Sequence, residues 1–485
     1  MNPPNILLLL TDDHAAWALH HAGNHELHTP HLDALAQRGC RFENAFTPTP
    51  VCSPARATLL TGLMPSQHGI HCWIQEHGPF AEQHGTRERD WLGSTPTLAT
   101  ELARDGYRCA LAGKWHCGRS LHRPPGYHMH CTVESGGSTH NHGLTYSIDG
   151  QAFGADGNRS RFIADAALQQ LDQLAGGAGR RPFFLHVGLI ATHSPYHERE
   201  HDPRWVEHYR NARFDDLPPY TPHPWRKNEA FTNDAVADPN EVAACRRGYY
   251  AAVSEVDEQV GRILCELDRR GLRDSTLIVY TSDHGCALGH NGFWGKGNST
   301  RPLNMYDVSL RVPLIVAGPG IARGAVINET ATHLDTFATL LEAAGGSVAE
   351  LSERTGLNHP GATFLPMLAD LPSSATDTIE WSNTVFGEYG DLRMIRTPSY
   401  KLVRRYPDGP DDLFDLMADP AEEVNLASQP EHRNLRERLL VQMERWFAAH
   451  QTEAHTGLNV KQGPCHNVDE AWRDGRREAR GLQVY

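Results

Sequence analysis

The sequence predicts an α/β fold with a large, mostly parallel sheet flanked by helices, followed by a smaller antiparallel sheet with one helix. Two observations predict this. Before residue 375, short apolar runs alternate with helical patterns, which is typical of a parallel sheet covered on both faces. After it, four short strands are crowded together ahead of a single helix. We therefore expect a first α/β domain over residues 1–375 and an α+β subdomain over 376–485.

The elements of the first domain follow in order. A buried strand is expected over 6–10, because this apolar run is ended by Thr11-Asp12-Asp13. Thr95-Pro96 opens a helix that Gly106 ends. By the same criteria, further strands are expected over 107–112, 182–190, 276–281 and 310–317, and further helices over 31–38, 56–61, 245–270 and 332–344.

The second domain contains shorter elements. Strands are expected over 384–388, 392–396, 401–404 and 413–416, and a helix over 431–449. The tail from 452 to 485 has no clear periodicity. We expect it to form an arm that packs on a neighbouring subunit, giving a homo-oligomer, or on its own core.

Composition and charge exclude several classes of function. A formal net charge of −14 argues against a nucleic-acid-binding protein. No apolar run is long enough to span a membrane, and Met1-Asn2-Pro3-Pro4 lacks the basic segment of a signal peptide. We therefore expect no membrane partner and a cytoplasmic location, with the ten cysteines as free thiols.

The segment Val51-Cys52-Ser53-Pro54-Ala55-Arg56 is the most informative stretch of the chain. Ser53 is expected to cap a helix, Pro54 suits its first turn, and Gly62 suits the position just past its end. This places Cys52 at a helix N-terminus, where backbone N–H groups favour an anionic sulfur or an anionic ligand. A buried structural cysteine is the alternative interpretation.

Cys52-x-Pro54-x-Arg56 followed by Leu60-Thr61-Gly62 resembles the signature of the type I sulfatases, a family of the alkaline phosphatase-like superfamily. The resemblance implies that a formylglycine-generating enzyme oxidises Cys52 to formylglycine. Ala55 departs from the serine of many relatives, at a position that tolerates variation. Ser309 to Ile315 and Asp412 to Leu416 also resemble the core strand and C-terminal subdomain of this family.

Acidic residues follow two of the predicted strands. Asp12 and Asp13 come after the first strand, and Asp283-His284 follows the strand over 276–281. Strand ends of this kind meet in the ligand crevice of an open parallel sheet, although each aspartate alone suits a helix cap equally well. The resemblance implies that all four, together with the residue at position 52, hold one divalent cation. Three carboxylates favour calcium first, then magnesium, and His284 also suits manganese.

Four basic side chains lie in loops after predicted strands. They are Lys114 and His116, then His193, and then Lys296 downstream of Asp283. Isolated lysines and histidines in loops are usually solvated surface residues. The resemblance instead implies that these four grip the sulfate oxygens and that Arg56 braces formylglycine.

The resemblance also implies a mechanism in which one hydroxyl of hydrated formylglycine attacks sulfur and the other later expels sulfate. Asp283 would accept the proton of the attacking hydroxyl. His193 or Lys296 would protonate the departing alcohol oxygen, and His116 would deprotonate the second hydroxyl. Lys114, Lys296 and the cation would neutralise charge on the sulfate oxygens.

The leading interpretation is therefore a sulfuric ester hydrolase, acting first on a carbohydrate sulfate and next on aryl or alkyl sulfates. One alternative is a phosphonate monoester or phosphodiester hydrolase of the same superfamily, although the cationic candidates Lys114 and His116 favour sulfate monoesters. The other is a noncatalytic sulfoglycan-binding protein. Six histidines between 14 and 31, and a cysteine and histidine group between 109 and 131, leave a second metal site open.

Overall fold

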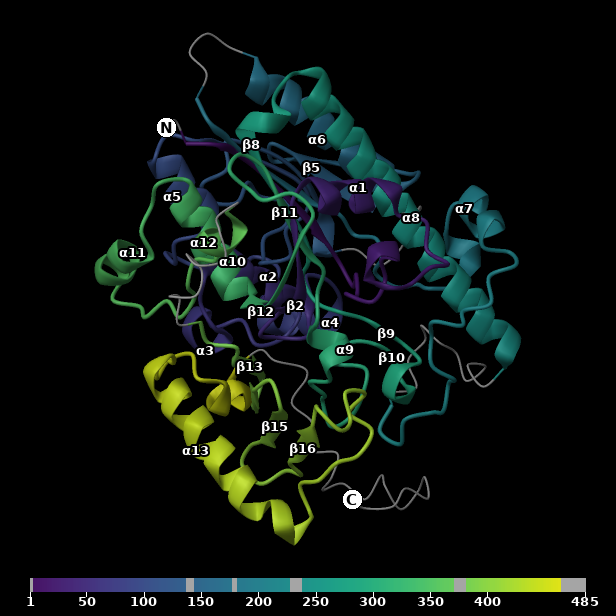
Figure 1. Ribbon diagram of the computed structural model, residues 1–485. Helices are drawn as coiled ribbons and strands as arrows, with labels where there is room; N and C mark the ends of the chain where they lie inside the picture. Colours follow the sequence, from purple (N-terminus) through teal and green to yellow (C-terminus); the bar gives the residue numbers. More distant parts are fainter. Residues whose placement is uncertain (1–2, 137–143, 177–180, 227–237, 370–380, 464–485) are drawn as a thin grey trace.

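A computed structural model describes residues 3–136, 144–176, 181–226, 238–369 and 381–463. Its centre is a ten-stranded mixed sheet of the order β12-β2-β11-β8-β1-β7-β3-β4-β5-β6, with parallel pairs at β8-β1-β7-β3-β4 and at β12-β2. The strands are β1 (Asn5–Thr11), β2 (Cys40–Phe46), β3 (Arg108–Lys114), β4 (Met129–Val133), β5 (Leu144–Ile148), β6 (Gln151–Ala155), β7 (Phe183–Gly188), β8 (Thr276–Ser282), β11 (Leu314–Ala317) and β12 (Ala325–Thr332). This confirms the predicted fold class, with antiparallel pairs joining β11 and the outer strands to the parallel centre (Figure 1).

Helices cover both faces of this sheet. They include α1 (Pro30–Arg38), α2 (Cys52–Thr61), α5 (Leu98–Arg104), α6 (Arg159–Ala175), α8 (Pro239–Arg269), α10 (His333–Ala343) and α11 (Val348–Thr355). The first part of the chain also contains α3 (Pro65–His68), α4 (Gly78–His84), α7 (Pro203–His208), α9 (Asp307–Leu310) and α12 (Leu365–Leu368). None of the helices in the described ranges combines the length and apolar character needed to span a membrane.

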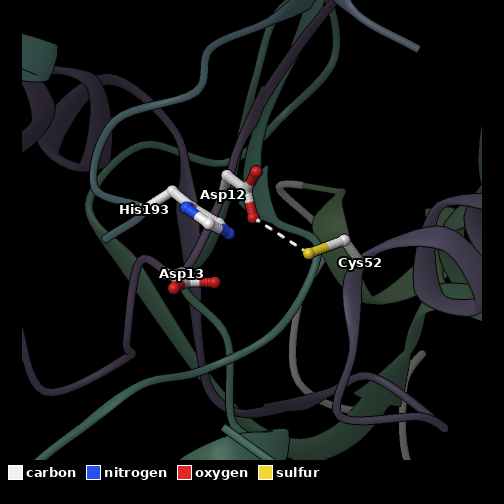
Figure 2. A group of neighbouring side chains, drawn as sticks. All are labelled: Asp12, Asp13, Cys52 and His193. Carbon is white, nitrogen blue, oxygen red and sulfur yellow. Dashed lines mark hydrogen bonds between the residues drawn. The ribbon is translucent and has the colours of Figure 1, made fainter. Parts of the chain in front are cut away.

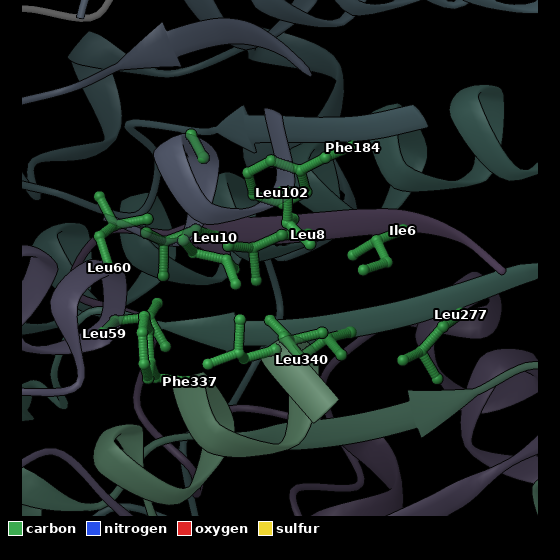
Figure 3. Close-up of a cluster of buried hydrophobic side chains, with 14 of the residues drawn as sticks. Ile6, Leu8, Leu10, Leu59, Leu60, Leu102, Phe184, Leu277, Phe337 and Leu340 are labelled. Atoms are coloured by element: carbon green, nitrogen blue, oxygen red, sulfur yellow. The ribbon is translucent and has the colours of Figure 1, made fainter. Parts of the chain in front are cut away.

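The alternation of side chains along β1 explains the two layers. Ile6, Leu8 and Leu10 point to one face, where they pack with leucines of α2 and α5 and with α10 (Figure 3). Leu7 and Leu9 point to the other face and share a cluster with α1, α6 and α8. Because β1 pairs with β7 and β8 on its two sides, it is buried at the centre of the domain. The pairing continues to its carboxyl end, which is therefore fixed by backbone hydrogen bonds on both sides.

A separate four-stranded antiparallel sheet follows, as predicted. Its strands in order are β13 (Val385–Tyr389), β14 (Leu392–Arg396), β15 (Tyr400–Arg405) and β16 (Asp412–Asp415), and α13 (Arg433–Ala449) packs on it through Leu439, Met443 and Phe447. Figure 1 shows this unit beside the large sheet. The predicted domain boundary at 375/376 falls outside the described residues and stays a prediction.

The first part of the C-terminal tail lies against its own chain. The Thr452 amide donates a hydrogen bond to the Ser66 carbonyl at 2.9 Å, and the Gly457 amide donates one to the Ser66 hydroxyl at 3.1 Å. Residues 464–485, which carry most of the predicted arm, lie outside the described residues. An arm-mediated homo-oligomer therefore stays a prediction.

Several predicted boundaries were wrong. α2 begins at Cys52 with Val51 as its N-cap, because the Ser53 hydroxyl accepts a hydrogen bond from the Ile74 amide at 2.9 Å and caps nothing. α5 begins at Leu98, since the Thr97 hydroxyl caps the helix in place of Thr95. The strand expected over 310–317 begins at Leu314, and α8 starts six residues earlier than expected, at Pro239. The strands β2, β4, β5, β6 and β12, the helices α6 and α11, and the short helices α3, α4, α7, α9 and α12 were not predicted.

Candidate active site

The predicted site residues meet at one edge of the large sheet, where parallel strands end. Asp12 and Asp13 follow β1, and Asp283 and His284 follow β8, its parallel neighbour. Lys114 is the last residue of β3, on the far side of β7. His193 lies in the chain after β7, and Lys296 follows the short strand β10 (Trp294–Gly295), which pairs with β9 (Ala287–Leu288).

Cys52 occupies the first position of α2 and is buried. The first turn of the helix therefore directs its free backbone N–H groups and the positive end of its dipole toward this edge. Gly62 ends the helix in the left-handed conformation, at φ 69°, as the sequence predicted. A Cβ at this position would lie 2.3 Å from the Phe337 ring, so the C-terminal end of α2 packs closely against α10.

Oxygen and nitrogen donors surround the Cys52 sulfur. The donor atoms of Asp12, Cys52, Asp283 and His284 all lie within 4.8 Å of one another, as do those of Asp12, Asp13, Cys52 and His193. Figure 2 shows the second group, with the Asp12 carboxylate beside the sulfur at 3.5 Å. The predicted donors therefore form one cluster. Neither group contains a cysteine or histidine of the 109–131 segment, or a histidine of the 14–31 segment.

Two buried lysines supply positive charge to this cluster. The Lys296 ammonium donates to the Asp13 carboxylate at 2.6 Å and lies 3.0 Å from the Cys52 sulfur. The Lys114 ammonium forms an ion pair with the Asp12 carboxylate. Both lysine side chains are almost fully shielded from solvent, at 10% and 1% relative exposure, so their charges act in a medium of low dielectric constant.

Arg56 joins the strands that carry the carboxylates. It is fully buried, and its Nε donates to the Asp283 carboxylate at 2.8 Å. Its terminal nitrogens donate to the carbonyls of Lys114 at 3.2 Å and Thr11 at 3.4 Å. In this structure Arg56 thus braces Asp283 and the ends of β1 and β3, and through them the surroundings of Cys52.

His116 presents one nitrogen to the site. Its Nε2 lies 3.0 Å from the Ile74 carbonyl, which can only accept, so Nε2 carries the hydrogen of the neutral ring. Nδ1 is buried and carries the lone pair of the ring, and the Cys52 side chain is the group of the site that interacts with this histidine. His193 is held by a 2.8 Å hydrogen bond from its Nδ1 to the Ser194 carbonyl.

The backbone is constrained where it approaches the site. Asp13 and His116 are not glycines but have φ values of 59° and 57°, a left-handed conformation that is uncommon for such residues and clusters at functional sites. Gly113 and Gly188 allow β3 and β7 to approach closely, because a Cβ on Gly188 would lie 2.4 Å from the Lys114 carbonyl oxygen. Side chains at these two positions would push β3 and β7 apart at the strand end that carries Lys114.

The charges shift the ionisation of the central groups. Burial alone would raise the pKa of Cys52, but Lys114, Lys296 and His284 hold it well below its usual value. Burial and the neighbouring Asp12 raise the pKa of Asp283. The site therefore stabilises an anion at position 52.

Three hydroxyl groups that hold Asp13 were not predicted from the sequence. The Tyr196 hydroxyl donates to the Asp13 carboxylate at 3.0 Å, and those of Thr192 and Tyr249 donate to its carbonyl at 2.8 and 2.7 Å. Thr192 precedes His193 and Tyr196 lies three residues after it, so both belong to a segment that the sequence had already singled out. Tyr249 comes from α8 and has no such signal.

Comparisons with known proteins agree with this geometry. The sulfatase family model matches residues 4–347, and the model described as N-sulphoglucosamine sulphohydrolase, C-terminal, matches residues 300–449. The choline-sulfatase of Rhizobium meliloti (strain 1021) is 30% identical over 460 residues, which cover 88% of this chain and 83% of the relative.

Two solved structures share the fold. One, determined in complex with its substrate D-glucosamine-2-N,6-O-disulfate, has a TM-score of 0.75 at 22% identity and covers 94% of this chain and 99% of its own. The phosphonate monoester hydrolase of Silicibacter pomeroyi has a TM-score of 0.69 at 23% identity and covers 93% and 96%. The fold is thus alkaline phosphatase-like. Because the sulfatase model spans most of the sequence, this chain belongs to the sulfatase family and is a sulfate ester hydrolase.

Proposed function

We propose that this enzyme hydrolyses a sulfate monoester of a saccharide, with Cys52 converted to formylglycine and one divalent cation bound beside it. The observation that carries the proposal is the convergence of acidic donors and two buried lysines on the Cys52 sulfur. Aryl and alkyl sulfates are the next substrate classes. The C-terminal family model and the disulfated sugar bound by the solved relative support the saccharide, whereas the choline-sulfatase relative supports an alkyl ester.

The donor set fits a hard divalent cation. Asp12, Asp283 and His284 gather around position 52, and Asp13 joins them through the overlapping group with Asp12 and a carboxylate oxygen 3.2 Å from His284 Nε2. Carboxylate oxygens with one imidazole nitrogen suit calcium or magnesium and also manganese. The Lys296 ammonium, within 3.2 Å of His284 Nε2 and 2.6 Å of Asp13, supports the view that this cluster attracts positive charge. Such a cation would supply a Lewis acid for the oxygen at position 52.

The position of Cys52 also fits the modification. Hydrated formylglycine supplies a hydroxyl nucleophile where the sulfur lies, at the N-terminus of α2, and a thiol does not. Cys52 and Arg56 are buried in the folded protein, so the formylglycine-generating enzyme must act before α2 packs into the core.

The remaining side chains then have defined tasks. Lys114 and Lys296 hold the negatively charged sulfate oxygens, and Arg56 keeps Asp283 oriented to accept a proton. The lone pair on Nδ1 of His116 suits it to take a proton from the group at position 52. His193 lies opposite Cys52 and suits protonation of the departing alcohol oxygen.

Two measurements test the proposal. Peptide mass analysis of protein made with a formylglycine-generating enzyme should show an aldehyde in place of the Cys52 thiol. The same protein should then release sulfate from sulfated sugars faster than from choline sulfate or aryl sulfates. If phosphodiesters or phosphonate monoesters are cleaved far faster than every sulfate ester, the result would instead support a phosphonate monoester or phosphodiester hydrolase. A persistent thiol in protein from its natural host would favour a sulfoglycan-binding role.

A further inference from the structure

An arginine that forms no ion pair with any described residue lies at the edge of this site. Arg159 is the first residue of α6 and is 2% exposed, yet among the described residues its guanidinium forms no ion pair and no hydrogen bond of good geometry, and the side chain that interacts with it is the neutral Tyr146 hydroxyl. The preceding Asn158 caps the helix by accepting a hydrogen bond from the Arg161 amide at 2.8 Å. The helix terminus is therefore satisfied without Arg159, whose side chain is buried for another reason.

The placement of Arg159 is unfavourable for the free protein in two ways. A buried charge without an oppositely charged partner is strongly disfavoured, and burial lowers the pKa of Arg159 to about 10 although the Tyr146 hydroxyl and the Asp12 carboxylate act to raise it. The positive end of the α6 dipole also repels a cation at this position. Such a residue is expected where a ligand supplies the missing negative charge.

The position of α6 places Arg159 near the sulfate site. This helix precedes β7 in the chain and packs on β3 and β7, so its N-terminus lies at the carboxyl ends of these strands. One turn after Arg159, Ile163 lies 2.9 Å from where a Gly113 Cβ would be, beside Lys114. Asp12, the carboxylate that acts on Arg159 electrostatically, is already paired with Lys114. Arg159 is thus close to Asp12, but the Asp12 carboxylate does not neutralise its charge.

We infer that Arg159 binds a second anionic group of the substrate, a carboxylate or a further sulfate, beside the ester that is cleaved. The inference rests on the proposed function and narrows its substrate to an anionic saccharide. The planar guanidinium can donate two parallel hydrogen bonds to either oxyanion, which a lysine cannot do. The same buried cation disfavours a quaternary ammonium such as that of choline sulfate.

The test compares matched substrates that differ by one anion. Glucose 2-sulfate and N-acetylglucosamine 6-sulfate carry the ester alone, whereas glucuronate 2-sulfate adds a carboxylate and glucosamine 2-N,6-O-disulfate adds a sulfate. Wild-type kcat/KM should be higher for the doubly charged member of at least one pair, mainly through KM, and the pair that responds identifies the anion. Arg159→Gln should lower kcat/KM for that member by about ten- to a hundredfold more than for its singly charged partner. Arg159→Lys should restore part of the difference.

Arg161→Gln is the matched control, because this exposed arginine lies two residues further along the same helix. Arg161→Gln should leave kcat/KM unchanged for both members of each substrate pair. A second readout is the melting temperature. If Arg159 stabilised the fold, Arg159→Gln would lower the melting temperature. If Arg159 is a buried charge without an oppositely charged partner, Arg159→Gln should leave the melting temperature unchanged or raise it. Equal losses on both members of every pair, or a wild-type preference for choline sulfate, would overturn the inference.

Binding separates this inference from the proposed function. In the Cys52→Ala background, calorimetry should show tighter binding of the doubly charged sugar, and Arg159→Gln should abolish this difference. Sulfate release from a singly charged sugar by the wild type tests the proposed function independently of Arg159. Equal affinities of the two sugars for the Cys52→Ala protein would overturn the role of Arg159 even if catalysis is confirmed.

Discussion

Replacing Lys114 by methionine tests the electrostatic basis of the proposed function. The substitution removes the ammonium group while keeping a flexible apolar chain of similar length. In the structure this ammonium pairs with Asp12 at the end of β1, and the Lys114 side chain is 1% exposed. We expect Lys114→Met to retain the fold but to lose most of its sulfate ester hydrolysis.

The magnitude follows from the burial of the charge. A preorganised donor in a site closed to water typically contributes about 3–4 kcal/mol to the transition state, which corresponds to a loss of roughly a hundred- to a thousandfold in kcat. An exposed charge is worth about 0–1 kcal/mol because water and salt screen it. Lys461 provides that comparison, since its side chain is 42% exposed and its ammonium lies 3.9 Å from the Asp391 carboxylate.

The assay measures sulfate release by Lys114→Met and Lys461→Met, with formylglycine content checked by mass and folding by circular dichroism. Lys461→Met should match the wild type. Because a phosphodiester has fewer charged oxygens than a sulfate monoester offers to the site, any phosphodiester activity should fall less than the sulfatase activity in Lys114→Met. A fully modified, folded Lys114→Met protein with kcat within about fivefold of wild type would refute the reasoning.

Four further outcomes are expected. Cys52→Ala should fold normally but lose essentially all activity, and retention of about a tenth of wild-type turnover would contradict the mechanism. Removal of divalent metal by a chelator should abolish sulfate release, and added calcium, magnesium or manganese should restore it. Asp13→Asn should lower the metal content measured by elemental analysis. Active protein free of divalent metal would show that the reaction does not use the cation. Lys401 is fully buried between Asp307 at 2.8 Å and Glu422 at 2.6 Å, so Lys401→Met should cost about 3–5 kcal/mol in denaturant unfolding, and a change under 1 kcal/mol would count against this. Burial raises the pKa of Glu255 from 4.5 to about 7, so the folded state holds its proton more tightly and stability should fall as pH rises between these values. Glu255→Gln should remove about 3 kcal/mol of the change in stability with pH. If the melting temperatures of the variant and the wild type changed in parallel with pH, Glu255 would not be the group responsible.

The sequence by itself determined the fold class and predicted which side chains gather around position 52. Local signals were enough, because an apolar run stopped by Asp12-Asp13 and a motif around Cys52 are read within a few residues. The topology of parallel strands then required these segments to meet at one edge. For the same reason the predicted cluster of donors around position 52 agrees with the structure.

Only the tertiary structure decided how those residues are partnered. Ser53 has the composition of a helix cap, but the Ile74 amide, 21 residues away, takes its hydroxyl, so α2 starts one residue earlier than the predicted cap. The hold of Tyr249 on Asp13 spans 236 residues. Arg159 has no local signal at all, since its significance is the lack of an oppositely charged partner once β3, β7 and α6 pack together. Burial and pairing are properties of contacts between distant segments, and those contacts exist only after the chain has folded.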